Sequence, residues 1–243
     1  MIERTKAFAR STSVISGLYY LAKVLRDMPV QDWAQLNKLN LFRKTYPNTM
    51  VGYARLSNAY ELAQLVEQTG LEGALVECGV WKGGCIATMA WVAKQANSNR
   101  SIWLFDSFEG LPVPTELDGP RAQEYIGRYA ASVEDVEGIL FSRLEINRDS
   151  VHIVKGWFQD TLPASKDEIG PIAILRLDGD WYESTRCCLE NLYDQIVPSG
   201  YVILDDYGCW EGCKIATDEF LQHSNISVTL AEIDNKGRFF RKP

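Results

Sequence analysis

Four aspartates stand in two closely spaced pairs, and each pair directly follows a short apolar run. The first pair is Asp178 and Asp180, and the second is Asp205 and Asp206. Apolar runs that end in carboxylates are typical of buried parallel strands, whose carboxyl ends meet at one edge of a sheet. Carboxylates gathered there repel one another unless a cation lies among them, and Mg²⁺ or Ca²⁺ prefers oxygen ligands. The pairs therefore predict a divalent metal site that could lower the pKa of a substrate hydroxyl, although single aspartates could instead be helix N-caps.

A second candidate site is the glycine-containing turn Glu77-Cys-Gly79-Val-Trp-Lys-Gly83-Gly84. Gly79 permits a tight turn after a strand, and Gly83 and Gly84 would let a ligand approach the start of a helix. The spacing departs from the G-x-G-x-x-G of nicotinamide-binding sheets. Glu77 would also repel a diphosphate but suit a cation, and S-adenosylmethionine carries an ammonium and a sulfonium but no phosphate. Charge therefore favours S-adenosylmethionine over NAD, FAD or ATP.

Asp106 ends another apolar run and could accept both ribose hydroxyls of such a cofactor. Ser107 and its successors could place backbone N–H groups near the adenine. A second candidate for the adenine wall is Gly156-Trp157-Phe158. Trp157 and Phe158 could equally pack between a helix and the sheet.

The apolar runs alternate with helical patterns, which indicates an α/β fold with a doubly wound parallel sheet. The turn-rich segment 234–237 joins two last strands, so we expect one antiparallel strand at the end of the sheet. Residues 1–50 are expected to form a helical appendage or lid, and 51–243 the main domain. The expected strands are 74–77, 101–105, 151–154, 172–177, 201–204, 227–232 and 238–241. The expected helices are 11–25, 31–42, 57–69, 83–95, 123–129, 184–195 and 211–222, together with one that Ser132 caps, with Asp135 three residues on.

Charge and composition disfavour several classes of partner. The chain of 243 residues has a formal net charge of −7, which argues against nucleic acid or an anionic membrane surface. No apolar run reaches the ~18 residues of a membrane span. Segment 11–25 reads as an amphipathic helix with Ser11 or Ser13 as its N-cap, and it has no obvious signal-peptide cleavage site. Six cysteines without CxxC spacing and two histidines disfavour zinc and fit a reduced, cytoplasmic protein.

Five ordered segments together resemble the macrocin O-methyltransferase family. Members of this family methylate sugar hydroxyls on antibiotics such as tylosin, mycinamicin and novobiocin. The resemblance covers roughly residues 48–241, and the segments that carry it are 76–84, 105–112, 155–158, 175–185 and 198–207.

The resemblance implies a class I S-adenosylmethionine-dependent methyltransferase sheet of order 3-2-1-4-5-7-6, together with S-adenosylmethionine and Mg²⁺. It implies that Asp178, Asp205 and Asp206 bind the metal and that Asp178 also acts as general base. Related catechol methyltransferases carry a basic lysine where this chain has Trp181. The residues expected to hold the cofactor are Glu77, Gly79, Val80, Asp106, Ser107, Gly156, Trp157 and Phe158.

The acceptor is less well defined by the sequence, because the family's acceptor-binding parts are short or unmatched here. We expect its walls in 1–50, 112–121 and 207–212. Four aromatic residues could stack on a sugar or an aromatic ring, or simply pack; they are Trp181, Tyr182, Tyr207 and Trp210.

The leading hypothesis is a magnesium-dependent O-methyltransferase that acts on a sugar-bearing natural product or glycan. One alternative is methylation of a catechol-like diol, which the missing lysine disfavours. Another is a non-catalytic S-adenosylmethionine-binding protein, which the clustered carboxylates disfavour because folding alone does not require them. The amphipathic N-terminal helix and the resemblance lead us to expect a homo-oligomer, a dimer or higher.

Overall fold

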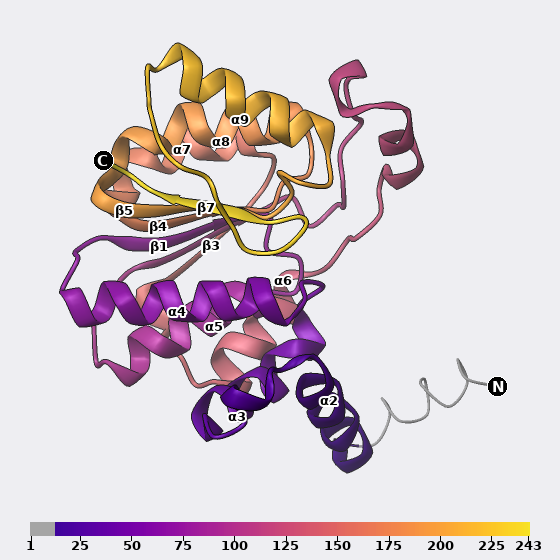
Figure 1. Ribbon diagram of the computed structural model, residues 1–243, viewed down its shortest axis with the longest axis vertical. Helices are drawn as coiled ribbons and strands as arrows, with labels where there is room; N and C mark the ends of the chain where they lie inside the picture. Colours follow the sequence, from indigo (N-terminus) through magenta and orange to yellow (C-terminus); the bar gives the residue numbers. More distant parts are fainter. Residues whose placement is uncertain (1–12) are drawn as a thin grey trace.

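The central sheet is built from the apolar runs that predict strands. The computed structural model describes the backbone of residues 13–243 and the side chains from Gly17 onward. Its strands follow the order β3-β2-β1-β4-β5-β7-β6, and β7 runs antiparallel to both β5 and β6 (Figure 1). The predicted order is thereby confirmed. The strands are β1 (Ala74–Cys78), β2 (Ile102–Asp106), β3 (Val151–Lys155), β4 (Ile172–Leu177), β5 (Ile196–Leu204), β6 (Ala231–Glu232) and β7 (Arg238–Arg241).

Helices cover both faces of this sheet, so β1 and β4 are buried along their whole length. Alternate residues of a strand point to opposite faces. Leu75 accordingly packs in one apolar core and Val76 in the other. The carboxyl ends of the parallel strands are left at an edge where loops meet. One face carries α7 (Phe158–Ile169), α8 (Tyr182–Leu192) and α9 (Glu211–His223), and the other carries α4 (Tyr53–Thr69) and α5 (Gly84–Gln95) (Figure 1).

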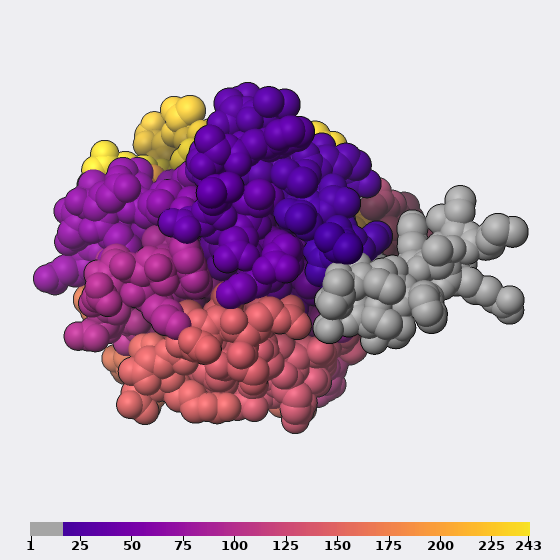
Figure 2. Space-filling view, turned by 90° about the horizontal axis from the view of Figure 1, so that it is seen from below, coloured from indigo at the N-terminus to yellow at the C-terminus, as the bar shows by residue number. Residues whose placement is uncertain are grey.

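The N-terminal segment packs on the α4–α5 side. It contains α2 (Ser13–Asp27) and α3 (Leu36–Thr45), which Figure 2 shows in indigo on one face of the molecule. Phe42 is fully buried in the same core as α4. Lys38 is buried too, with its Nζ 2.9 Å from Glu61 Oε1. Ser11, one of the two predicted caps, lies outside the described residues, and the lid role of this segment stays a prediction.

The segment between β2 and β3 extends away from the sheet before it returns (Figure 1). It contains two 3-10 turns, η3 (Glu116–Asp118) and η4 (Pro120–Tyr125), where the sequence pattern predicts a helix over 123–129. It then enters α6 (Val133–Glu137), which continues as a π-helical turn, η5 (Gly138–Arg143). Among the described helices, none is both long enough and apolar enough to cross a membrane.

Several further elements differ from expectation. α3 begins at Leu36 rather than at residue 31, and β6 begins at Ala231 rather than at residue 227. α4 begins at Tyr53 rather than at Ser57, whose hydroxyl instead donates to Glu61 one turn later at 2.8 Å. β5 begins at Ile196, because an irregularity in its pairing with β4 absorbs the Pro198–Gly200 stretch that was expected to lie outside the strand. α7 is not predicted at all, since it is largely polar and contains Pro163.

Candidate functional site

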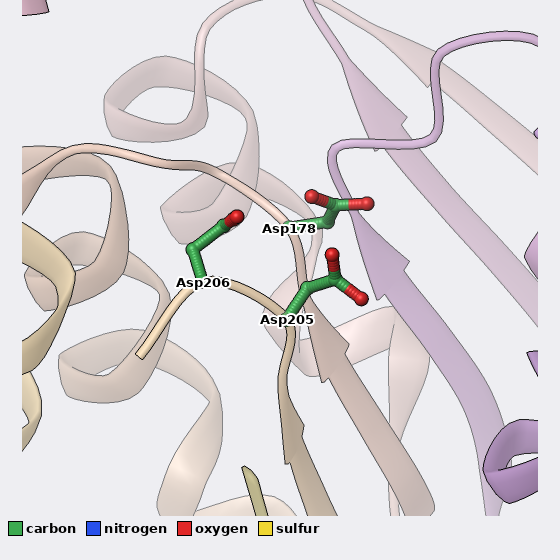
Figure 3. Close-up of side chains that lie close together, drawn as sticks. All are labelled: Asp178, Asp205 and Asp206. Carbon is green, nitrogen blue, oxygen red and sulfur yellow. The ribbon is translucent and has the colours of Figure 1, made fainter. Parts of the chain in front are cut away.

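The carboxyl ends of β4 and β5 bring Asp178, Asp205 and Asp206 together. Leu177 pairs with Leu204 across the two strands, so the residues that follow emerge side by side. One carboxylate oxygen from each aspartate lies within 4.8 Å of the others, and the three side chains share one space (Figure 3). These are hard oxygen donors of the kind that Mg²⁺ and Ca²⁺ prefer. The donor set therefore fits a divalent cation.

A buried arginine that the sequence analysis did not single out lies beneath these aspartates. Arg176, in β4, is 1% exposed and donates to Glu77, Asp178 and Asp205; its Nη1 lies 2.9 Å from Asp178 Oδ2. Its presence in an otherwise apolar strand is the signal that could have revealed it. A fully buried guanidinium requires carboxylate partners.

A second arginine reaches the cluster from a distant part of the chain. Arg55, in the first turn of α4, donates through Nη1 to Asp205 and through Nε to Asp234 Oδ2 at 3.1 Å. Asp205 thus accepts hydrogen bonds from two guanidinium groups, one at each carboxylate oxygen. No local pattern in the sequence connects residues so far apart.

Negative charge nevertheless exceeds positive charge at the site. Neither Asp180 nor Asp206 forms an ion pair with any residue that the structure describes. Burial, together with neighbouring carboxylates, raises the pKa of both well above the ordinary value. Burial also raises the pKa of Asp205 to about 6, although Arg176 and Arg55 oppose the change. A divalent cation, or protons, would relieve this imbalance.

Beside the aspartates, Asp106 is held in a different way. It accepts backbone N–H hydrogen bonds from Val80 at 2.8 Å, Trp81 at 2.9 Å and Phe108 at 2.7 Å. Burial raises the pKa of Asp106 despite these donors. The carboxylate therefore fixes the turn after β1 and the turn after β2 against each other.

Gly79 joins two halves of the site, the Asp106 side with the turns after β1 and β2, and the aspartate cluster after β4 and β5. Its φ of 86° favours glycine, and a Cβ at this position would collide with the carbonyl oxygen of Asp178. The turn after β1 therefore packs directly on the backbone that carries the first aspartate pair. Any side chain here would push the two halves apart.

Both halves open into a single cavity of about 680 Å³. Met50 from the N-terminal segment and Val113 and Tyr129 from the segment after β2 form part of its wall. Asp180 also lines it. Seven residues predicted for the site line this cavity: Gly79, Asp106, Ser107, Gly156, Trp157, Phe158 and Asp178.

The comparison with known proteins agrees with this geometry. Residues 30–242 match the family described as macrocin-O-methyltransferase (TylF). The chain belongs to this family. It is accordingly an O-methyltransferase with the class I S-adenosylmethionine-dependent methyltransferase fold.

Two curated relatives span nearly the whole chain. The 8-demethyl-8-(2,3-dimethoxy-alpha-L-rhamnosyl)-tetracenomycin-C 4'-O-methyltransferase of Streptomyces olivaceus is 36% identical over 94% of this chain and 89% of its own length. The demethyldecarbamoylnovobiocin O-methyltransferase of Streptomyces niveus is 33% identical over 96% and 97%, respectively. The solved structure of the O-methyltransferase NovP is 34% identical and superposes with a TM-score of 0.70 over 80% of this chain and 82% of that one.

Two residues predicted to touch the cofactor in this O-methyltransferase do not line the cavity. Glu77 is 1% exposed and bound to Arg176, and burial raises its pKa to about 8 against the effect of that guanidinium. Val80 is buried and uses its N–H on Asp106. Both lie behind the cavity wall and support residues that face it.

The expectation that Gly83 and Gly84 leave room for a ligand is wrong. A Cβ on Gly84 would lie 2.6 Å from the Asn48 carbonyl oxygen, and one on Gly83 would lie 3.2 Å from Val136 Cγ1. The protein's own N-terminal segment and α6 fill these spaces. The two glycines therefore allow close packing rather than ligand approach.

The four aromatic candidates mostly pack. Trp181 is 1% exposed and borders the cavity, but its Nε1 donates to the Pro112 carbonyl at 3.0 Å and its ring lies edge-on to Trp210. The hydroxyls of Tyr182 and Tyr207 donate to Glu219 and Asp218, each at 2.7 Å. These contacts favour the packing interpretation, in which Trp181 and Trp210 hold the segment after β2 in place.

Proposed function

We propose that this O-methyltransferase transfers a methyl group from S-adenosylmethionine to a hydroxyl of a sugar-bearing natural product or glycan, and that it requires Mg²⁺. The observation that carries the proposal is the contact between the two halves of the site. Gly79 packs on the Asp178 backbone, and both Asp106 and Asp178 line one cavity, with Asp205 and Asp206 buried behind Asp178. A methyl donor and a hydroxyl acceptor held there would be neighbours.

The cofactor half consists of residues around the Asp106 turn. A carboxylate offers about four lone-pair sites, and three N–H donors occupy most of those on Asp106. One site remains on Oδ1 for a ribose hydroxyl, so a single hydroxyl contact replaces the predicted pair. Trp157 and Phe158 line the cavity after β3 and supply the adenine wall.

The metal half is assigned to Asp178, Asp205 and Asp206. When bound there, Mg²⁺ lowers the pKa of an acceptor hydroxyl and orients it, while S-adenosylmethionine supplies the methyl group. The oxygen-only donor set and the excess of carboxylates over guanidiniums support this assignment. Arg176 and Arg55 orient Asp205 from below and from the side.

Two carboxylates compete for the role of general base. Asp178, the base implied by the resemblance, already accepts a hydrogen bond from Arg176 and belongs to the metal cluster. Asp180 lines the same cavity, and no ion pair holds it within residues 13–243. Its positive φ of 57° lies in the left-handed region, which aspartate adopts more readily than most residues with a side chain. We therefore favour Asp180 as the group that receives the hydroxyl proton.

A glycosylated acceptor is supported by the relatives, since the one from Streptomyces olivaceus is named for a rhamnosyl substrate. The catechol alternative is disfavoured further, because Trp181 stands where the lysine base would be and is buried by its own contacts. Assembly as a homo-oligomer, location in the cytoplasm and the absence of nucleic-acid or membrane partners stay predictions.

Two measurements test the proposal. Calorimetric titration with S-adenosylhomocysteine should show one site, and transfer of labelled methyl from S-adenosylmethionine to a panel of natural-product glycosides should stop when EDTA is added. Failure to bind S-adenosylhomocysteine at millimolar concentration would rule out the cofactor assignment. Methyl transfer that is indifferent to EDTA would rule out the metal.

A further inference from the structure

Arg55 connects three segments that are distant in sequence. It belongs to the first turn of α4, which follows the stretch containing the cavity residue Met50. Its guanidinium donates to Asp205 at the end of β5 and to Asp234 in the turn between β6 and β7. Only 9% of the residue is exposed. The contacts are therefore part of the interior of the site rather than a surface ion pair.

The turn that receives Arg55 is itself firmly built. Asp234 Oδ1 accepts the backbone N–H groups of Lys236 and Gly237, each at 2.8 Å. A Cβ on Gly237 would lie 2.9 Å from Arg55 Cδ, so the turn packs closely against the arginine side chain. The N–H of Gly208, just after the second aspartate pair, donates to the Lys236 carbonyl at 2.6 Å. Arg55 is thus held in a fixed position beside Asp205.

In this position, the positive charge of Arg55 lies next to the carboxylates that would bind a cation. Both oxygens of Asp205 accept guanidinium hydrogen bonds, one from Arg176 and one from Arg55. A divalent cation bound by the cluster would have to use the lone pairs that remain on Asp205. It would then lie close to the Arg55 guanidinium, which has the same sign of charge.

We infer that Arg55 is a resident counter-ion that limits how tightly the aspartate cluster holds its divalent cation. This inference rests on the proposed magnesium dependence. The arginine stabilises the crowded carboxylates when no cation is bound, and its charge opposes the cation when one is bound. The site would therefore exchange its metal rather than retain it permanently.

Loss of Arg55 could also weaken the site by releasing Asp205, so the two effects must be compared. Asp205 would keep its hydrogen bond from Arg176, which is fully buried. Its backbone N–H would still donate to the Leu177 carbonyl at 2.9 Å. These two contacts would keep Asp205 oriented, whereas among the described residues no basic side chain other than Arg55 and Arg176 forms an ion pair with Asp205. The charge effect should dominate.

The test measures Mg²⁺ affinity directly, by calorimetric titration of the full chain with saturating S-adenosylhomocysteine. Replacing Arg55 by Gln (R55Q) should tighten Mg²⁺ binding by about tenfold or more, because a unit charge near a divalent cation matters strongly at an effective dielectric constant of about 20. R55K keeps the charge and should bind Mg²⁺ within about threefold of the wild type. R55Q should also lower Tm without Mg²⁺ and recover most of that loss when Mg²⁺ is added.

Arg100 provides a matched control. It is another largely buried arginine, with Nε 2.8 Å from Glu67 Oε1, and it donates to the Leu71 carbonyl just before β1. R100Q should lower Tm but leave Mg²⁺ affinity unchanged. This separates general destabilisation from an effect on the metal.

Each outcome is decisive. Mg²⁺ binding by R55Q that is unchanged or weaker than in the wild type would overturn the inference while leaving the proposed function intact. Equal tightening in R100Q would overturn it as well, since the effect would not come from the site. If the wild type itself binds no Mg²⁺, the metal dependence fails, and this inference fails with it.

Discussion

In the cofactor half of the site Asp106 is held by three backbone N–H groups, whereas in the metal half Asp205 is held by two guanidinium groups. Backbone donors carry no net charge, so they hold Asp106 in place without neutralising it. Guanidiniums partly neutralise the metal half. The carboxylates of the two halves are thus stabilised in different ways, one by backbone N–H groups and the other by side-chain charges.

The difference also concerns distance along the chain. Val80 and Trp81 reach Asp106 across a single strand-turn-helix unit, with separations of 26 and 25 residues. Arg55 and Asp205 are 150 residues apart. The cofactor half is therefore a local product of the β1–β2 unit, while the metal half depends on assembly of the whole domain. Substitutions should consequently affect the two halves independently.

The largest effect is expected from Asp178→Asn. Asparagine keeps the shape and can still accept from Arg176, but it removes a charged metal ligand. Mg²⁺ affinity should fall by more than about 100-fold, and methyl transfer should fall below detection. S-adenosylhomocysteine should bind as in the wild type, as measured by calorimetry. Loss of cofactor binding in this variant would show that the halves are not independent.

Asp180→Asn should reduce kcat by about 10²- to 10⁴-fold, the usual contribution of a general base. Asparagine tolerates the positive φ at this position, so the fold should be retained. Mg²⁺ affinity should change far less than in Asp178→Asn. Methyl-transfer assays at saturating Mg²⁺ check this prediction. Full activity of Asp180→Asn would mean that Asp178, rather than Asp180, is the general base.

Asp106→Ala should weaken S-adenosylhomocysteine binding by about 10- to 100-fold, as expected when hydrogen bonds to a charged group are lost. It also leaves three buried backbone N–H groups without their acceptor. Mg²⁺ binding in the absence of the cofactor should be unchanged. Calorimetric titration with each ligand measures the two affinities separately. An equal loss of both would contradict the independence of the cofactor half and the metal half.

The smallest effect is expected from Asp234→Asn, at the edge of the metal half. Burial would raise the pKa of Asp234, but the N–H groups of Gly237 and Lys236 and the Arg55 guanidinium outweigh it, and the pKa is lowered from its ordinary 3.8. A carboxyl whose pKa is lowered in the folded state stabilises the fold at pH values above its unfolded-state pKa. That stabilisation is lost as the pH falls through its folded-state pKa.

The destabilisation caused by Asp234→Asn should therefore be present at neutral pH and shrink at about pH 3. Urea unfolding at both pH values measures it. Asp167→Asn, at an exposed carboxylate that forms no ion pair with described residues, is the control and should show no such trend. A destabilisation that is constant with pH would mean that the charge of Asp234 contributes nothing.

Much of the fold and of the cofactor half can be predicted from sequence, because both depend on local patterns. Apolar runs that end in Asp106, Asp178 or Asp205 predict strands and their carboxyl ends. The positive φ of Gly79 is likewise predictable, because glycine adopts such a conformation more readily than other residues. What the pattern could not predict was α7, whose polar sequence carries a proline and offers few apolar positions.

The arginines of the metal half escaped prediction for a different reason. A charged residue inside an apolar strand must find buried partners, so Arg176 could have been suspected. Its partners, however, lie in β1 and just after β4 and β5, far apart in sequence. The same buried arginine explains why Glu77, which is predicted to hold the cofactor, does not line the cavity. Its carboxylate does meet a cation, but the cation is Arg176 rather than a ligand.

The central claim is that the Asp106 turn and the aspartate cluster form one site for two ligands. The most direct test is a crystal structure with S-adenosylhomocysteine and Mn²⁺, which replaces Mg²⁺ and can be located by its anomalous scattering. The account predicts one Mn²⁺ peak bound by Asp178, Asp205 and Asp206, with the ribose of S-adenosylhomocysteine on Asp106 in the same cavity. A structure with the cofactor bound but no metal peak at these aspartates would contradict it.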